Sequence, residues 1–146
     1  MNFLIVTGLS GAGKSMAVNA LEDIGFFCID NIPAGLLPRI LDFAQQGENQ
    51  LSRVAVVMDI RGLHSVQETN EALEALDEKK MPYDILFLDA SDAAIRRRYK
   101  ETRRVHPMTI SEGIPVSEAI TKERQILQPL RERAKYVIDT SLLSTA

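Results

Sequence analysis

The 146-residue sequence contains no tryptophan and a single cysteine. One thiol, Cys28, cannot form a disulfide within the chain, and low cysteine use is typical of proteins of the reducing cytoplasm. Because Cys28 lies inside an apolar run, we expect it to be an inert core residue. Disulfide-stapled secreted classes are therefore excluded.

Long hydrophobic runs are also missing. No stretch approaches eighteen apolar residues, so no transmembrane helix is indicated. The amino-terminal letters "MNFLIVTG" carry neither a charged leader nor a cleavage site and are not a signal peptide. These absences predict a cytoplasmic protein that does not contact a membrane.

An excess of positive charge is absent as well. The formal net charge is −3 and the sequence pI is about 5.4, which argues against a nucleic-acid footprint over the whole surface. Hydrophobic residues make up 45% and charged residues 25%. With this length, the composition predicts one soluble domain, residues 1–146, with a substantial core.

Five short apolar runs alternate with segments of helical periodicity. The runs are expected to be strands at residues 3–7, 26–30, 54–59, 84–89 and 135–139. Such alternation predicts an α/β fold with a five-stranded parallel sheet and helices on both faces. Ser65 and Glu68 suggest a capping box at the start of one helix, and Pro129 is expected to kink or split the last helix. Residues 106–116 form the longest irregular stretch.

The first strand runs into a glycine-rich segment that fits the pattern GxxxxGK(S/T). Its glycines allow successive backbone N–H groups to turn inward around phosphate oxygens, and the next helix adds its positive end. Lys14 would reach the β- and γ-phosphates, and the Ser15 hydroxyl would bind Mg²⁺. The predicted nucleotide-binding residues of this P-loop are Gly8, Leu9, Ser10, Gly11, Ala12, Gly13, Lys14 and Ser15.

Several of the predicted strands end in an aspartate. We favour Asp59 as the partner of Mg²⁺, because the third strand commonly lies beside the P-loop strand in kinase-like folds. Asp89 is interpreted as a residue of a strand-to-helix turn. Asp30 could face an acceptor or an attacking water, or could form a turn before Pro33; the sequence favours neither.

A basic segment spans residues 96–106. On a helix, Arg97, Lys100 and Arg104 would form one stripe, while Ile95 and Tyr99 would face the sheet. The stripe resembles a kinase lid, in which Arg97 and Arg104 would close over the nucleotide as catalytic residues beside Lys14 and Asp59. Contact with an RNA backbone and a solvated helix face remain alternatives.

Four segments together resemble the RapZ/YvcJ family of bacterial nucleotide-binding proteins: "GLSGAGKS", "ALEDIGFFCIDNIP", "FLDAS…RRYKETRRVHP" and "ITKERQILQPLRERAKYVIDTS". The resemblance covers essentially the whole chain and implies a kinase-like P-loop NTPase fold. Family members are about twice this length, which implies that this chain is the N-terminal half and that a C-terminal domain is absent.

The resemblance also implies binding and slow hydrolysis of ATP or GTP with Mg²⁺. It places a proposed guanine-nucleotide segment at Asp59, Ile60, Arg61 and Gly62. Some members regulate amino-sugar metabolism through RNA, and the resemblance assigns RNA and protein contacts mainly to the missing domain. No NKxD signature selects guanine, and a homo-oligomer remains an open expectation.

Three functional hypotheses follow from these observations. The leading one is a regulatory nucleotide-binding domain with weak ATPase or GTPase activity. The first alternative is a small-molecule kinase that transfers the γ-phosphoryl group to an acceptor near Asp30. The second is a binding module in which the nucleotide only sets the conformation.

Overall fold

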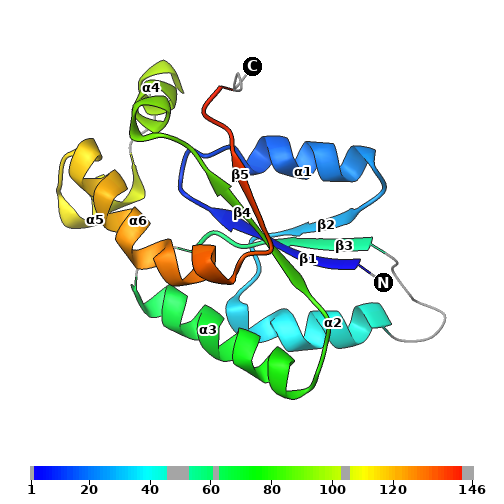
Figure 1. Cartoon of the computed structure of the whole chain (residues 1–146). Coiled ribbons are helices and arrows are strands. Elements are labelled where there is room, and N and C mark those ends of the chain that lie inside the picture. Colours follow the sequence, from blue (N-terminus) through cyan, green and yellow to red (C-terminus); the bar gives the residue numbers. More distant parts are fainter. Residues whose placement is uncertain (1, 46–52, 61–62, 103–105, 143–146) are drawn as a thin grey trace.

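The computed structural model describes residues 2–45, 53–60, 63–102 and 106–142. Five parallel strands form one sheet in the order β2-β3-β1-β4-β5 (Figure 1). The prediction of a five-stranded parallel α/β fold is confirmed. The strands are β1 (Asn2–Gly8), β2 (Phe27–Asp30), β3 (Arg53–Val57), β4 (Asp84–Asp89) and β5 (Tyr136–Asp139).

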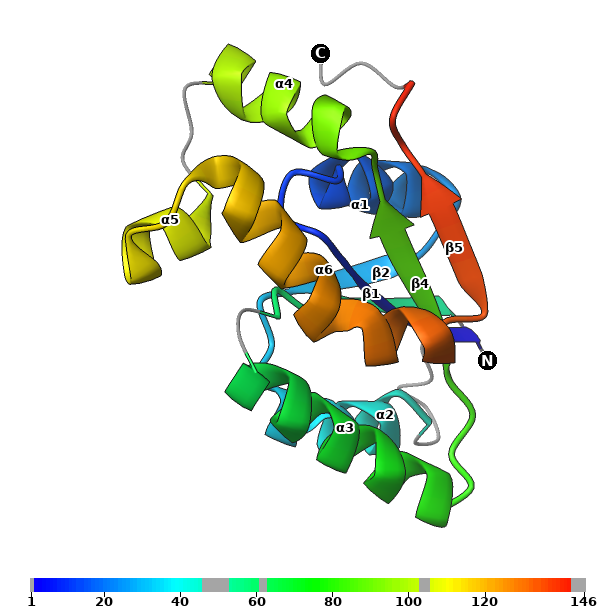
Figure 2. The same ribbon diagram turned by 60° about the vertical axis from the view of Figure 1, so that its left-hand side comes forward.

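Helices cover both faces of this sheet. The α1 helix packs on one face, and α2, α3 and α6 lie on the other (Figures 1 and 2). The helices are α1 (Lys14–Asp23), α2 (Leu37–Gln45), α3 (Leu63–Glu78), α4 (Asp92–Thr102), α5 (Pro107–Glu112) and α6 (Val116–Arg133), with a 3₁₀ turn at Ala34–Leu36 before α2. Among the described residues, no helix combines the length and apolar character needed to cross a membrane.

The core lies around the central strand β1. Ile5 and Val6 of β1 are almost fully buried, as are Val56 of β3 and Phe87 of β4. A strand covered on both faces needs apolar residues at successive positions, which explains the continuous runs in the sequence. The carboxyl end of β1, and the loop that follows it, therefore lie at one edge of the sheet.

Two local predictions need correction. The α3 helix already begins at Leu63, so Ser65 lies within its first turn and does not form the predicted capping box. Instead, the Ser65 carbonyl accepts a hydrogen bond from the Thr69 hydroxyl (2.8 Å). The stretch expected to be irregular contains the short helix α5. Pro129 does not split the last helix, because α6 continues through it. Pro129 is exposed, as expected where a helix tolerates a missing backbone donor.

Candidate phosphate-binding site

The predicted P-loop connects the carboxyl end of β1 to the first turn of α1. Gly11 and Gly13 have φ angles of 83° and 96°, a left-handed backbone that side chains disfavour. Gly13 occupies the N-cap position of α1, where no side chain caps the helix. The glycine spacing therefore reflects a backbone path that this loop requires.

The loop's backbone donors divide into two sets. The amides of Leu9, Ser10 and Ala12 donate to Leu88 O (3.2 Å), Glu123 Oε1 (2.9 Å) and Leu9 O (3.0 Å). Within the described part of the chain, no acceptor is found for the amides of Gly11 and Gly13. The first turn of any α-helix adds N–H groups without an intrahelical acceptor. Unsatisfied donors thus gather at the positive end of α1, an arrangement that binds anions.

Lys14 places its ammonium group over this loop. Its Nζ donates to the carbonyls of Gly8 (3.2 Å) and Leu9 (3.3 Å). Ser15, the next residue, is exposed at the start of α1. A phosphate bound in the loop would offer Lys14 charged acceptors in place of two carbonyls, and hydrogen bonds between charged groups are the stronger ones.

The α4 helix and the end of β5 hold the loop from one side. Arg98 Nη1 donates to Gly11 O (3.0 Å) and to Thr140 Oγ1 (3.0 Å), and Arg98 Nη2 donates to Thr140 O. The Thr140 hydroxyl in turn donates to Ala12 O (2.7 Å). Arg98 is only 4% exposed. Burial, followed by the charge of neighbouring Arg97, lowers the pKa of Arg98, but a guanidinium remains charged at neutral pH.

Sequence reasoning missed Arg98, although a signal was present. Arg98 follows Ile95 by three residues and precedes Tyr99, so it shares the inward face predicted for those two residues. That inward face is confirmed, because Ile95 and Tyr99 are both buried beneath the loop. A β-carbon on Gly11 would lie 3.2 Å from Tyr99 Cε2.

Replacing Arg98 with methionine should lower the free energy of unfolding by about 2 kcal/mol, because two carbonyls lose their donor. Methionine keeps most of the aliphatic stem, so packing changes little. Arg97, exposed on the same helix with one 3.3 Å bond to Ser141 O, provides the matched control. Arg97→Met should change stability by less than about 0.5 kcal/mol. Urea denaturation of the two variants measures the difference, and equal midpoints would contradict the assignment.

A buried carboxylate holds the loop from the other side. Glu123 of α6 accepts from the Ser10 amide through Oε1 (2.9 Å) and from the Ser10 hydroxyl through Oε2 (2.7 Å). His106 Nε2 lies 3.2 Å from Glu123 Oε1. Glu123, His106 and Ser10 are 3%, 0% and 8% exposed. Sequence reasoning missed Glu123, which is 113 residues from its partner in the loop.

Two carboxylates lie at or just beyond the ends of the strands that flank the loop strand, because β1 pairs with both β3 and β4. The expected position of the third strand beside the P-loop strand is therefore confirmed. Asp59 is exposed two residues beyond the end of β3. Asp89 accepts from Arg124 Nη1 (2.8 Å) and the Ala90 amide (2.8 Å), which supports its interpretation as a residue of the strand-to-helix turn.

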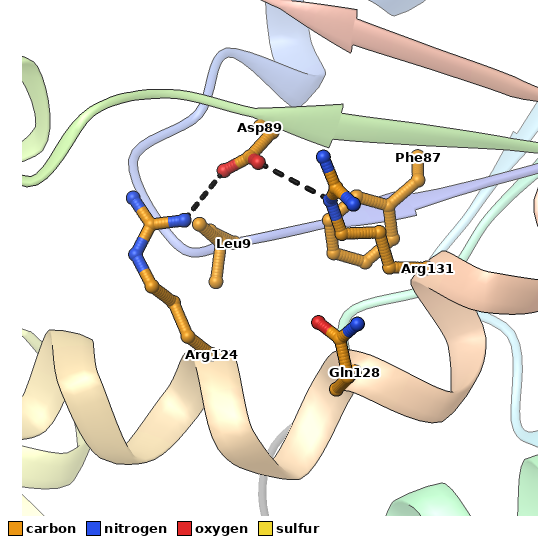
Figure 3. Close-up of a pocket in the computed structure, with 6 residues that line it drawn as sticks. All are labelled: Leu9, Phe87, Asp89, Arg124, Gln128 and Arg131. Carbon is orange, nitrogen blue, oxygen red and sulfur yellow. Dashed lines mark hydrogen bonds and ion pairs between the residues drawn. The ribbon is translucent and has the colours of Figure 1, made fainter.

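A hollow of about 250 Å³ lies between α6 and the ends of β1 and β4. Asp89 stands at its rim between Arg124 and Arg131, with an Oδ2–Nε distance of 3.4 Å to Arg131 (Figure 3). The other residues that line the hollow are Leu9, Phe87 and Gln128. The ion pairs tie α6 to the sheet directly beside the loop.

The remaining predicted site residues are only partly brought together. Ile60 is buried, and Asp30 is exposed at the end of the edge strand β2. Asn31 follows Asp30 with a φ of 58°, a backbone typical of a turn. Arg61, Gly62 and Arg104 lie outside the described residues. Within the described ranges, no three metal-binding side chains gather into a cluster.

Sequence comparison gives matches over the whole chain. A family model described as the RapZ-like N-terminal domain matches residues 1–146. A relative from Agathobacter rectalis, named nucleotide-binding protein, is 48% identical over 99% of this chain and 49% of its own length. A relative of the same name from Moorella thermoacetica is 50% identical, over 97% of this chain and 48% of its own length. The chain thus spans about half the length of the curated relatives it matches.

Comparison with solved structures confirms the kinase-like architecture. A shikimate kinase from Acinetobacter baumannii, solved in complex with shikimate, superposes with a TM-score of 0.63 at 16% identity. The superposition covers 94% of this chain and 83% of the kinase. At this identity the similarity shows the fold alone, a P-loop kinase fold.

Proposed function

The chain belongs to the RapZ-like N-terminal domain family, and on this premise we propose that it is a regulatory nucleotide-binding domain that hydrolyses ATP or GTP slowly. One observation carries the proposal: among the described residues no acceptor is found for the amides of Gly11 and Gly13, which lie between the loop carbonyls that hold the Lys14 ammonium and the first turn of α1. Such a set of donors binds a polyphosphate. The name of the relatives, nucleotide-binding protein, agrees with this function.

Mg²⁺ is the metal that this site would use. Ser15 and Asp59 would hold it, since both are exposed oxygen donors placed after the two adjacent strands β1 and β3. Hard oxygen ligands suit this ion, and few protein ligands suffice because Mg²⁺ keeps several waters. When bound, the metal would neutralise phosphate charge. Asp59, Ile60, Arg61 and Gly62 would border the nucleotide on this side.

Hydrolysis would depend on positioning and charge neutralisation. The loop amides and Lys14 hold the β- and γ-phosphates, and Arg97 and Arg104 would supply positive charge from the segment after β4. Phosphoryl transfer needs no covalent group from the protein, so this set is sufficient for slow turnover by water. RNA or protein partners would act mainly through the other half of the full-length protein, since the net charge of this chain is −3.

Calorimetric titration with ATP, ADP, GTP and GDP, each with and without Mg²⁺, tests the proposal. We expect saturable binding of at least one triphosphate, tighter with Mg²⁺, and slow phosphate release. Absence of binding by all four nucleotides would overturn the proposal. Turnover that rises sharply with a small hydroxyl compound would instead assign a metabolite kinase, and binding without turnover would assign a pure binding module.

A further inference from the structure

We propose that Glu123 is a positioning residue for the P-loop, through which nucleotide binding and the packing of α5 and α6 stabilise each other. The inference rests on the proposed function for its ligand. It goes beyond that function by assigning a residue outside the P-loop pattern to the control of nucleotide affinity.

The first argument is the geometry at Ser10. Both donors of this one residue, its amide and its hydroxyl, bind the two oxygens of the Glu123 carboxylate at 2.9 and 2.7 Å. Two bonds to one rigid group fix the rotation of the backbone at Ser10. Arg98 holds the next carbonyl, that of Gly11. The peptide that presents the Gly11 amide is therefore fixed on both sides.

The second argument is the continuation of this network to α5. The Met108 amide donates to His106 Nδ1 (3.0 Å), which caps the start of α5. Because Nδ1 accepts, a neutral imidazole carries its proton on Nε2, and that N–H faces Glu123 Oε1 at 3.2 Å. The loop, the start of α5 and the α6 helix thus meet at one carboxylate.

The third argument is energetic. A buried carboxylate is tolerated only when its oxygens accept hydrogen bonds, and Glu123 accepts three from Ser10 and His106. Any movement of α6 away from the loop removes two of these bonds and leaves charge unsatisfied. A ligand that orders the loop must then favour the packed state of α5 and α6. By linkage, that packing strengthens ligand binding equally.

The test compares Glu123→Ala and the milder Ser10→Ala with Lys122→Ala on the same helix. Lys122 is half-exposed, and its pair with Glu112 of α5 (2.7 Å) is an exposed ion pair that adds little to the packing of the two helices. Its loss therefore tests the effect of a substitution in α6 without touching the loop. With each variant shown to be folded by circular dichroism, we expect Glu123→Ala to weaken MgATP binding about tenfold. Ser10→Ala should weaken it about threefold, and Lys122→Ala should leave it unchanged.

Hydrogen exchange separates positioning from simple structural support. In the wild type and in Lys122→Ala, MgATP should slow amide exchange in residues 107–133; in Glu123→Ala this protection should be lost. Wild-type affinity and retained protection in folded Glu123→Ala, even with a lower melting temperature, would overturn the proposal.

Ligand-free exchange distinguishes failure of this inference from failure of the proposed function. If the wild type binds no nucleotide, the proposed function fails. His106→Ala should still speed amide exchange at residues 9–13, because the hydrogen bonds that join His106, Glu123 and the loop are present without a ligand. Unchanged exchange at the loop in folded His106→Ala would refute the positioning role by itself.

Discussion

Replacing Lys14 with alanine should weaken binding of MgATP or MgGTP about a hundredfold. The ammonium lies over the loop, with its Nζ 3.2 Å from Gly8 O and 3.3 Å from Leu9 O, where a bound phosphate would replace these neutral acceptors. A charge-assisted hydrogen bond contributes about 1.5–3 kcal/mol, which corresponds to a factor of about 10–100. Two phosphate contacts from one ammonium place the loss at the upper end of this range. Calorimetric titration measures it directly.

Lys79→Ala serves as the control, because Lys79 is exposed immediately after α3 and far along the chain from the loop. The Lys79→Ala variant should bind the nucleotide with the same affinity as the wild type. Thermal unfolding supplies an independent measurement, since a ligand that binds only the folded state raises the melting temperature. Excess nucleotide should stabilise the wild type and Lys79→Ala but not Lys14→Ala. Equal stabilisation of all three proteins would show that the nucleotide binds elsewhere.

Replacing Gly8 with alanine should lower the free energy of unfolding by about 3 kcal/mol. An added β-carbon would clash with Leu88 O and lie 2.8 Å from Leu88 N, both backbone atoms. Gly8 and Leu88 are register partners in the β1–β4 pair, so neither strand can move without breaking ladder bonds. Overpacking of this kind costs about 1–3 kcal/mol, and the φ of 153° adds strain for any side chain.

Gly35→Ala is the matched control for the loss of a glycine. A β-carbon at Gly35 would meet nothing within 4 Å, and this residue needs no left-handed backbone. Its stability should stay within about 0.5 kcal/mol of the wild type, or rise slightly because alanine restricts the unfolded chain. Urea denaturation with a shared slope compares the midpoints. A Gly8→Ala midpoint as high as that of Gly35→Ala would contradict the close approach of β1 and β4.

The choice between Asp59 and Asp89 shows the limit of topological reasoning. The sequence favoured Asp59 because the third strand was expected beside the first, and β3 does pair with β1. However, β4 pairs with β1 as well, so strand order cannot separate the two carboxylates. The difference lies in their exposure: Asp89, bound by Arg124 from α6, has only 16% of its side chain exposed, whereas Asp59 is an exposed residue. Arg124 is 35 residues from Asp89 in the sequence, and no local pattern links the two.

The sequence by itself determined the five strands, the helices that connect them and the P-loop. These features depend on neighbouring residues: apolar runs make buried strands, and glycines permit left-handed backbone within a single turn. Only the tertiary structure decided which polar residues hold that loop. Arg98 rather than Arg97 reaches the Gly11 carbonyl, and Glu123 meets Ser10 across 113 positions. A hydrogen bond between distant segments depends on where helices pack, and that packing is set by the whole core.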